Sequence, residues 1–258
     1  MNLQIKNKTA LVTGSTAGIG LAIAKALADE GARVIVNGRT QSRVDEAMKK
    51  SGAAHGIAVD LGTEAGARAV IAQYPEVDIL VNNLGIFEAK PFEHITDADW
   101  FRFFEVNVLS GVRLSRHYIG PMKKQNWGRI VFVSSESGLQ IPAEMIHYGM
   151  TKTAQLAVAR GLAETTSGTE VTVNSVLPGP TASEGVTTFV NDLAAQKGID
   201  RHALEREFFQ KARPSSLLQR FATPEEVASV VAFVCSPLAS AINGASVRAD
   251  GGVVRSIA

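Results

Sequence analysis

The chain has little cysteine, few aromatic residues and no excess of charge of either sign. Its single cysteine, Cys235, excludes an internal disulfide and a thiolate metal site, and no metal site is expected elsewhere. Because Cys235 follows the apolar run at residues 230–234, we expect it to be a buried structural thiol rather than a reactive one. The net charge of +1 gives no basic field for nucleic acid. A small neutral or weakly charged ligand is therefore the expected partner.

Long hydrophobic runs are missing as well. The first six residues do not form the apolar segment of a signal peptide, and no uninterrupted apolar run approaches membrane-spanning length. We therefore expect a cytoplasmic protein without a membrane segment. A content of 45% hydrophobic and 20% charged residues is typical of a soluble globular protein. No fixed-period repeat, low-complexity tract or proline-rich linker divides the chain, so we expect one domain over residues 1–258.

Short apolar strands alternate with helical patterns along the chain. The strand candidates are residues 8–13, 33–37, 55–59, 77–82, 129–134 and 171–177. Residues 19–30 and 224–234 are predicted helices. This alternation is typical of an α/β fold, in which a parallel sheet is covered by helices on both faces and ligands bind at the carboxyl ends of the strands.

The alternation is interrupted between residues 183 and 220. Apolar residues at positions 186, 189, 190 and 193 form one helical stripe, and Asp200 is a suitable N-cap for a second helix that contains Leu204 and Phe208. The two helices belong either to the core or to a mobile lid over a substrate. Insertions next to a binding site often act as lids, so we favour the lid.

A glycine-punctuated loop, Thr13-Gly14-Ser15-Thr16-Ala17-Gly18-Ile19-Gly20, falls at the first strand-to-helix turn. In a dinucleotide site, Gly14 permits the tight turn, Gly18 lets the backbone approach a pyrophosphate, and Gly20 allows the helix to pack closely on the strand. Free amides at the start of the helix then bind the phosphates. A purely structural role for these glycines is the alternative, because their spacing is Gly-x-x-x-Gly-x-Gly rather than Gly-x-Gly-x-x-Gly.

A second pattern joins Tyr148 to Lys152, four residues later, and to Ser135, thirteen residues earlier. On a helix, residues four apart lie on one face, so the ammonium can sit beside the phenol. The ordinary pKa of tyrosine is about 10, and we expect the nearby cation to lower it toward the working pH of a general acid or base. Together with the glycine loop, this pattern indicates hydride transfer between a nicotinamide and a carbonyl group.

The chain resembles the short-chain dehydrogenase/reductase family along nearly its whole length. The motifs that carry the resemblance, in the family's order, are the loop from Thr13 to Gly20, Asn82-Asn83-Leu84-Gly85, Asn107, Ser134-Ser135, Tyr148-Gly149-Met150-Thr151-Lys152, Pro178-Gly179 and Asp250-Gly251-Gly252. Leu84 departs from the pattern, since the family usually has alanine there. The resemblance implies a doubly wound, Rossmann-type domain with a mainly parallel seven-stranded sheet. It also implies a lid at about residues 183–220.

The resemblance assigns catalytic roles to four residues. Tyr148 is the proton donor in carbonyl reduction and the base in alcohol oxidation, Lys152 also holds the nicotinamide ribose, and Ser135 hydrogen-bonds the substrate oxygen. Asn107 orders a proton-relay water beside the lysine. For Asn107 the alternative is an ordinary helical asparagine. Ser134 is the better candidate for closing the strand.

The predicted cofactor contacts are Gly14, Ser15, Thr16, Gly18, Ile19, Gly20, Arg39, Asp60, Leu61, Asn83, Gly85, Tyr148, Lys152, Pro178, Gly179 and Thr181. Among those implied by the resemblance, Asp60 and Leu61 meet the adenine edge, Asn83 the adenosine side and Thr181 the carboxamide. Asp60 has an alternative role in starting the next helix.

The second strand is followed by Asn37-Gly38-Arg39-Thr40, with no carboxylate between residues 33 and 43. Enzymes that prefer NAD have an acidic residue in this region to bind the ribose hydroxyls. Here no carboxylate is present to repel the 2′-phosphate of NADP(H), and Arg39 can bind that phosphate. We therefore expect NADP(H) to be favoured over NAD(H). The alternative is a solvated loop arginine, and Ser15 and Thr16 stand where many NADP-dependent relatives have a second basic residue.

The leading hypothesis is an NADP(H)-dependent oxidoreductase acting on a small carbonyl or alcohol. One alternative is a 3-oxoacyl-[acyl-carrier-protein] reductase, although Gly-Thr-Glu at residues 168–170 replaces a basic residue often found there. An alternative of another class is a non-catalytic nucleotide-binding redox sensor or scaffold.

Between the serine and the tyrosine, Glu136, Gln140, Glu144 and Met145 either line the pocket or face water. Two carboxylates there would suit a polar or hydroxylated substrate. We expect His147 to be a surface or wall residue, because neighbouring helical residues do not face one way.

The resemblance implies a homotetramer or homodimer. Four residues, Phe101, Phe104, Val108 and Val112, serve either the core or such an interface.

Overall fold

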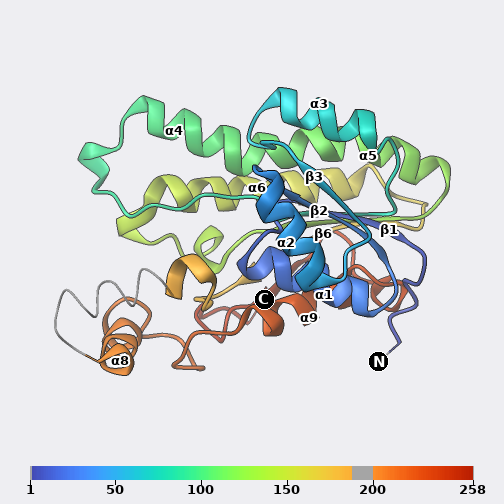
Figure 1. Ribbon diagram of the computed structural model, residues 1–258. Helices are drawn as coiled ribbons and strands as arrows, with labels where there is room; N and C mark the ends of the chain where they lie inside the picture. Colours follow the sequence, from blue (N-terminus) through green and yellow to red (C-terminus); the bar gives the residue numbers. More distant parts are fainter. Residues whose placement is uncertain (1, 188–199, 258) are drawn as a thin grey trace.

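Seven parallel strands form one sheet in the computed structural model, which describes residues 2–187 and 200–257 (Figure 1). The strands are β1 (Thr9–Val12), β2 (Arg33–Gly38), β3 (His55–Ala58), β4 (Ile79–Asn82), β5 (Gly128–Val133), β6 (Val171–Pro178) and β7 (Ser246–Ala249). Their order across the sheet is β3-β2-β1-β4-β5-β6-β7. The predicted doubly wound α/β fold is therefore confirmed, and all six strands expected from the pattern are present.

Helices cover both faces of the sheet. They are α1 (Gly18–Asp29), α2 (Gln41–Ser51), α3 (Glu64–Gln73), α4 (Asp97–Phe104), α5 (Ser110–Lys124), α6 (Ile146–Glu164), α8 (Arg201–Lys211) and α9 (Pro224–Val234). Figure 1 shows α3, α5 and α6 on one side of the strands and α1 and α9 on the other. None of the helices in the described ranges is long and apolar enough to cross a membrane.

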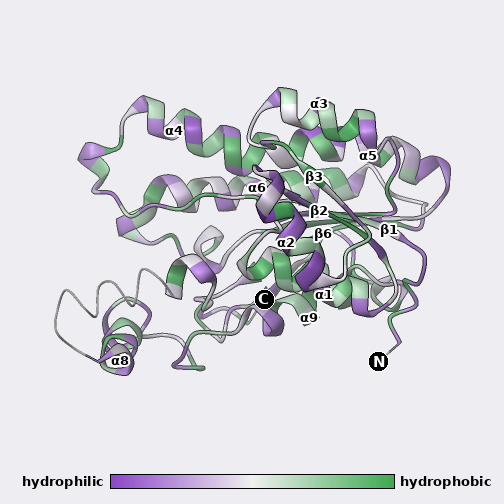
Figure 2. Ribbon diagram, in the orientation of Figure 1, coloured by the Kyte–Doolittle hydropathy of each residue, from purple (hydrophilic) through white to green (hydrophobic). Residues whose placement is uncertain are grey.

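Alternating strand residues supply the two cores. In β1, Ala10 and Val12 pack with α1, α2 and α9, whereas Leu11 packs with α3, α5 and α6. In β5, Val131 and Phe132 divide between the two cores in the same way. Strands buried on both faces are continuously apolar, which is why the sequence shows short apolar runs instead of polar alternation (Figure 2). Burying each such side chain contributes about 1.5–3 kcal/mol.

Helix boundaries follow local capping chemistry. The threonine at the start of α9, Thr223, accepts the Glu226 amide at 3.2 Å, while Glu226 accepts the Thr223 amide at 2.8 Å, and Pro224 occupies the first helical position. This explains why the predicted and observed limits of α9 agree. Cys235 follows α9 and is fully buried, as expected.

The site is expected where β1 and β4 lie side by side. From β1 the chain continues toward one edge of the sheet, and from β4 it continues toward the other. The loop after β1 and the loop after β4 meet there. The side-chain amide of Asn83 donates to the carbonyl oxygens of Thr13 and Gly14, both at 3.0 Å. The glycine loop is thus fixed to the end of β4.

Part of the expected lid at 183–220 lies outside the described residues, namely residues 188–199, which include three of the four positions in the first helical stripe. The second predicted helix is confirmed as α8, and Asp200 caps it by accepting the amides of His202 at 2.9 Å and Ala203 at 3.3 Å. Figure 1 shows α8 at the periphery, apart from the helices that cover the sheet. Rings of Phe208 and Phe221 stack at 5.2 Å.

We predict that Gly20→Ala destabilises the fold by about 1–3 kcal/mol, as overpacking does. A Cβ at Gly20 would lie 2.4 Å from the Gly14 carbonyl oxygen and 2.5 Å from the Asn83 amide nitrogen. The control is Gly161→Ala on the exposed side of α6, where no atom lies within 4 Å of the new Cβ. Alanine there should stabilise the helix by about 0.5–1 kcal/mol. Urea unfolding of both variants gives the comparison, and equal midpoints would contradict the close approach at Gly20.

Candidate active site

The glycine loop has the backbone geometry that a phosphate site needs. Gly14 has φ of 58° and Gly18 of 53°, both in the left-handed region that favours glycine. Helix α1 begins at Gly18, and its N-cap residue, Ala17, provides no side-chain hydrogen bond. The first amides of α1 are therefore open to an anion. Ile19 is half-buried and packs against the core below the loop.

Ser15 and Thr16 face the protein. The Ser15 hydroxyl donates to the Val12 carbonyl at 2.7 Å and accepts the Asn37 amide at 2.9 Å, and the Ser15 side chain is fully buried. It shapes the loop and has no free group for a ligand. Thr16 packs on Gly38, where a Cβ would lie 2.3 Å from its methyl group.

The two residues predicted to meet the adenine edge, Asp60 and Leu61, differ in exposure. Asp60 is exposed and accepts the Gly62 amide at 2.9 Å. The N-cap of α3 is Thr63, which accepts the Gly66 amide at 3.0 Å, so the alternative role of Asp60 as the helix cap is taken by Thr63. Leu61 is buried in the core and offers only its backbone.

Arg39 stands at the exposed end of β2 and makes no ion pair within residues 2–187 and 200–257. Nearby in sequence, Arg43 pairs with Glu184 at 3.2 Å. Arg39 therefore has a free guanidinium at the strand end predicted to meet the ribose.

Three of the predicted cofactor contacts, Pro178, Gly179 and Thr181, lie at the end of β6 and just after it. Gly179 lies against Asp250, whose carbonyl oxygen would be 2.4 Å from a Cβ at Gly179. Thr181 is buried, and its hydroxyl donates to the Gly179 carbonyl at 2.9 Å. Pro178 ends β6. The turn at 250–252 also finds its partner here, since the Gly251 carbonyl accepts amides from the segment before α9.

Reciprocal hydrogen bonds join Lys152 to the end of β5. Its ammonium donates to the Val133 carbonyl at 3.0 Å, and its own carbonyl accepts the Ser134 hydroxyl at 2.9 Å. This gives Ser134 the structural role expected of it. The ammonium lies 5.6 Å from the centre of the Tyr148 ring, and Ser135 is close enough to the phenol to lower its pKa. The structure thus brings the serine, the phenol and the ammonium together.

Burial controls the protonation of this group. Burial raises the pKa of Tyr148 well above its ordinary value, and the Glu136 carboxylate raises that pKa further, while the hydrogen bond to Ser135 opposes the change. The expectation that the nearby cation brings the phenol pKa down toward the working pH is therefore wrong, because the effect of burial is larger. Burial also lowers the pKa of Lys152 to about 8, against the opposing effect of Glu136. At neutral pH the phenol keeps its proton and most of the lysine is charged.

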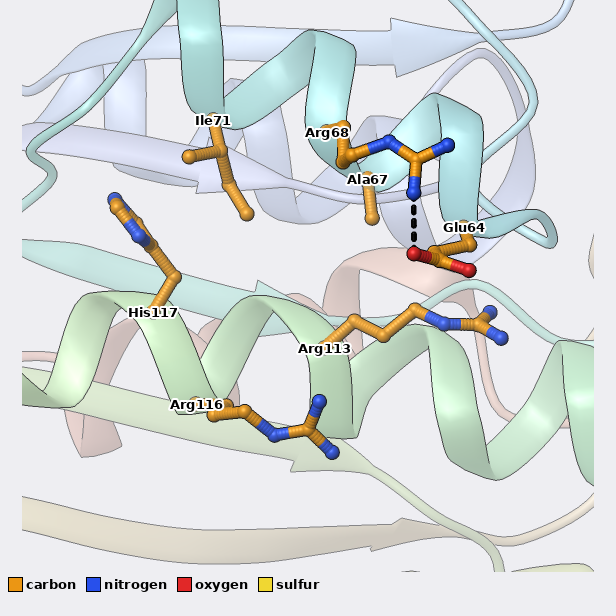
Figure 3. Close-up of a pocket in the computed structure, with 7 residues that line it drawn as sticks. All are labelled: Glu64, Ala67, Arg68, Ile71, Arg113, Arg116 and His117. Carbon is orange, nitrogen blue, oxygen red and sulfur yellow. Dashed lines mark hydrogen bonds and ion pairs between the residues drawn. The ribbon is translucent and has the colours of Figure 1, made fainter.

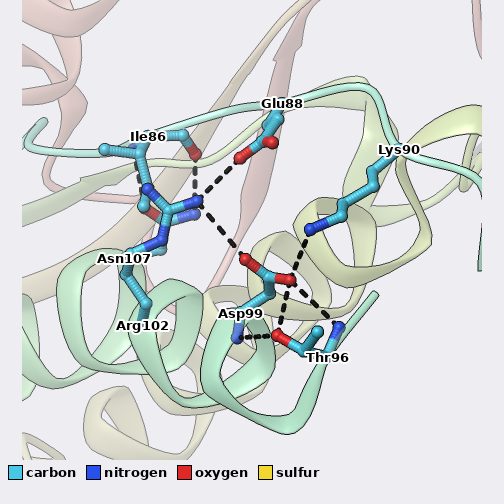
Figure 4. Close-up of polar contacts among 7 residues, drawn as sticks. All are labelled: Ile86, Glu88, Lys90, Thr96, Asp99, Arg102 and Asn107. Atoms are coloured by element: carbon cyan, nitrogen blue, oxygen red, sulfur yellow. Dashed lines mark hydrogen bonds and ion pairs between the residues drawn. The ribbon is translucent and has the colours of Figure 1, made fainter. Parts of the chain in front are cut away.

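Asn107 lies where a π-helical turn, Glu105–Leu109, interrupts the passage from α4 to α5. Figure 4 shows its amide against Ile86: the oxygen accepts the Ile86 amide at 2.7 Å, and the nitrogen donates to the Ile86 carbonyl at 3.0 Å. Asn107 also donates to Thr151 at 3.0 Å. It is therefore not an ordinary helical asparagine, because its side chain fixes the loop after β4 to α6.

The same loop is held to α4 by ion pairs (Figure 4). Lys90 contacts Asp99 at 2.6 Å, and Arg102 contacts Glu88 at 2.7 Å. Gly85 lies at the inner end of this loop, where a Cβ would be 3.5 Å from the Asn107 side-chain oxygen and 3.6 Å from the Lys152 nitrogen.

Sequence reasoning missed Gln155. Its side-chain oxygen accepts the Lys152 ammonium at 3.2 Å, and its nitrogen donates to the Asn107 carbonyl at 2.5 Å. This buried amide thus bridges the lysine and Asn107, the two residues between which the resemblance implies a relay water. The available signal was a polar residue one helical turn after Lys152, on the same face.

An ion-pair cluster, in which Glu136 and Arg213 are buried and Glu144 is exposed, adjoins the serine. The Glu136 carboxylate accepts the Ser135 hydroxyl at 2.5 Å and the Arg213 Nε at 3.1 Å, and Arg213 Nη1 donates to Glu144 at 3.2 Å. Glu136 is 4% exposed and Arg213 8%. The sequence analysis named the two glutamates without ranking them. It missed Arg213, which is 77 residues from Glu136 in the chain.

His147 is not a surface residue. It is 0% exposed, and its ring lies 4.0 Å from that of Phe103 and 6.0 Å from that of Trp100. Burial lowers its pKa, so the ring is neutral at physiological pH. Its place is between α4 and α6. One-residue spacing predicted correctly that the two side chains diverge, but it could not show that a second helix covers the histidine.

A separate cavity of about 380 Å³ lies between α3 and α5 (Figure 3). Its lining residues are Glu64, Ala67, Arg68, Ile71, Arg113, Arg116 and His117. None of them belongs to the predicted site.

Comparison with known proteins identifies the family. The family of the short chain dehydrogenases matches residues 8–194 of the chain. The protein belongs to the short-chain dehydrogenase/reductase family. An uncharacterised oxidoreductase of Bacillus subtilis, YvaG, is 51% identical over 263 residues, with full coverage of both chains. The 3-oxoacyl-[acyl-carrier-protein] reductase FabG of Aquifex aeolicus is 35% identical, with 98% of this chain and all of the relative covered.

Among solved structures, the L-sorbose reductase of Gluconobacter frateurii, complexed with NADPH and L-sorbose, superposes with a TM-score of 0.92. The two chains are 29% identical and covered completely. Family membership makes this protein an oxidoreductase, and the cluster around Tyr148 is its candidate active site.

We predict that Gln155→Leu destabilises the protein by about 1–3 kcal/mol, because it removes one acceptor of the buried Lys152 ammonium and the side-chain donor to the Asn107 carbonyl. The loss should be largest below the Lys152 pKa of about 8, where the ammonium is charged, and should shrink above it, where the amine is neutral. Urea unfolding at pH 6.5 and pH 9.5 measures the difference. The control is Gln73→Leu on exposed α3, expected to change stability by less than about 0.5 kcal/mol. A loss that does not depend on pH would show that Lys152 does not use this bond.

Proposed function

We propose that the protein is an NADP(H)-dependent oxidoreductase that interconverts a small carbonyl compound and its alcohol. The observation that carries this proposal is the group formed by Ser135, Tyr148 and Lys152 at the carboxyl end of β5. In an oxidoreductase family, a phenol beside a hydroxyl and an ammonium is suited to proton transfer at a carbonyl oxygen. Asn107 supports the same group from the loop after β4.

When bound, the reduced nicotinamide supplies a hydride to the carbonyl carbon. Tyr148 gives its proton to the carbonyl oxygen as the C=O π bond breaks, which leaves an alcohol and a phenolate. The raised phenol pKa keeps this proton available at neutral pH, and the Lys152 ammonium stabilises the phenolate. Ser135 donates a hydrogen bond to the same oxygen and stabilises the developing charge. Oxidation reverses these steps, with Tyr148 as the base.

The glycine loop and the start of α1 fit the dinucleotide phosphates. Gly14 and Gly18 provide the left-handed turns, and the uncapped helix end provides amide donors. The remaining predicted contacts, including Asn83, Gly85 and Thr181, belong to the loops around the same edge of the sheet. Ser15 acts by shaping the loop.

Arg39 is the basis for the NADP(H) preference. Its unpaired guanidinium suits a 2′-phosphate. The L-sorbose reductase that this chain resembles was solved with NADPH, which is consistent with the same preference here.

We predict that Arg39→Ala weakens NADPH binding by about 10- to 100-fold, as expected for loss of a hydrogen bond to a charged group, and leaves NADH binding unchanged. Arg33→Ala is the matched control, because Arg33 is an exposed arginine at the other end of β2. Dissociation constants from fluorescence titration test both. Equal losses for NADPH and NADH would contradict a phosphate contact.

Two further predictions from the sequence become part of the proposal. We propose that residues 183–220 form a substrate lid, supported by α8 and the aromatic contacts of Phe208 with Phe209 and Phe221. We also propose a dimer or tetramer, supported by Phe101 on α4, which is 76% exposed, whereas Val108 belongs to the core.

We predict that Tyr148→Phe lowers kcat by about 10²- to 10⁴-fold and leaves NADPH binding intact, because the substitution removes only the proton donor. Activity is measured by NADPH oxidation with free ketones, aldehydes and sugars and with a 3-oxoacyl group on acyl carrier protein. Tyr74→Phe, on the surface beside α3, is the control.

A wild type that binds NADPH but reduces none of these substrates would support the redox sensor or scaffold. Turnover restricted to the carrier substrate would support the acyl-carrier reductase.

A further inference from the structure

The substrate side of the candidate site contains a buried carboxylate that the catalytic steps do not use. Glu136 follows Ser135 directly and is 4% exposed. A carboxylate is rarely buried unless it is paired. Here Arg213 pairs with it at 3.1 Å, so the negative charge is held in place beside the reacting group.

Glu136 and a substrate carbonyl compete for one proton, that of the Ser135 hydroxyl. A serine hydroxyl has one proton, and Ser135 gives that proton to Glu136 at 2.5 Å, while its oxygen accepts the Ser137 amide at 3.1 Å. A substrate carbonyl needs that same proton. When Ser135 turns to the substrate, Oε2 of Glu136 loses its donor while Oε1 keeps Arg213, and a buried acceptor atom without a donor is unfavourable.

A hydroxyl on the carbon next to the carbonyl can replace the lost donor. Its oxygen lies beside the carbonyl oxygen, as Glu136 lies beside Ser135, so one substrate can accept from the serine and donate to the carboxylate. A ketone or aldehyde without this hydroxyl cannot do both. Ser135 and Glu136 together therefore favour hydroxylated substrates.

Charge also disfavours acids. The cluster holds two carboxylates, Glu136 and Glu144, and a single guanidinium, Arg213, whose Nε and Nη1 are both used. A substrate carboxylate near Glu136 would meet like charge, which is destabilising. The Lys152 ammonium is already bonded to Val133 and Gln155.

Arg213 also connects this site to α8. Its amide donates to the Phe208 carbonyl at 3.1 Å, and its guanidinium lies 5.9 Å from the centre of the Phe208 ring. The residue that holds Glu136 thus follows α8, the helix in the proposed lid, two residues after its end. Arg213 is a positioning residue, because it acts through Glu136.

Building on the proposed function, we propose that Glu136, positioned by Arg213, recognises a hydroxyl next to the reacting carbonyl, and that the substrates are neutral hydroxylated ketones or aldehydes and the matching polyols.

The test compares two ketones that differ in one hydroxyl, 1-hydroxy-2-butanone and 2-butanone, with NADPH. The wild type should have a kcat/KM about 10- to 100-fold higher for the hydroxyketone, the ratio expected for one hydrogen bond to a charged group. Glu136→Ala should lower kcat/KM for the hydroxyketone by a similar factor and that for 2-butanone by less than about threefold. Glu136→Gln, which preserves the shape, and Glu136→Asp, which preserves the charge, should retain part of the selectivity. Glu164→Gln, at the exposed end of α6, is the control.

Arg213 is tested through its coupling to Glu136. Arg213→Gln should raise KM for the hydroxyketone more than it lowers kcat, and Arg213→Lys should recover part of the loss. The double variant Glu136→Gln/Arg213→Gln should be no worse than the poorer single variant, because the two residues act as a unit. Thermal unfolding of each variant identifies losses due to misfolding.

Equal kcat/KM of the wild type for the two ketones would overturn this inference alone. So would equal losses for both ketones in folded Glu136→Ala, or a preference for pyruvate over the hydroxyketone. No turnover of any of the three compounds by the wild type would overturn the proposed function together with this inference.

Discussion

The reciprocal bonding of Lys152 to the end of β5 is the interaction on which the candidate site depends. The ammonium reaches the Val133 carbonyl, and the backbone carbonyl of the same residue accepts the Ser134 hydroxyl. These two bonds fix the start of α6 against the strand. They thereby set the distance from the phenol on α6 to Ser135, the first residue past Ser134. Without them, the spacing of Tyr148 and Lys152 in the sequence would not specify where the pair faces.

Three asparagines hold the loops that surround this point. Asn37 accepts the Gly14 amide at 3.2 Å and donates to the Val59 carbonyl at 3.1 Å. Asn83 joins the glycine loop to β4, and Asn107 joins the next loop to α6. An amide side chain donates and accepts at once, so it can satisfy a backbone carbonyl and a backbone amide together. At this edge of the sheet, asparagine side chains therefore supply the hydrogen bonds to backbone groups that a neighbouring strand would otherwise supply.

Local pattern predicted the fold well, and the candidate site partly. Strand and helix positions followed from residue spacing, because burial on both sides of a parallel sheet imposes continuous apolar strands and helices with one apolar face. Gly14 and Tyr148 were found because their roles depend on neighbours close in sequence. Arg213 was not, since its partner is 77 residues away. The shift in the Tyr148 pKa was missed for a related reason: it arises mainly from burial, which depends on the whole fold.

The Gln155 bridge has a consequence for the supply of protons. A carboxamide binds ammonium well, but unlike a water molecule it does not readily release one proton while taking up another. The hydrogen bonds from Lys152 through Gln155 to Asn107 are therefore poorly suited to carry protons toward the interior. Gly85 is exposed and lies close to the lysine nitrogen. We therefore expect the phenol to regain its proton between turnovers from the side of Gly85.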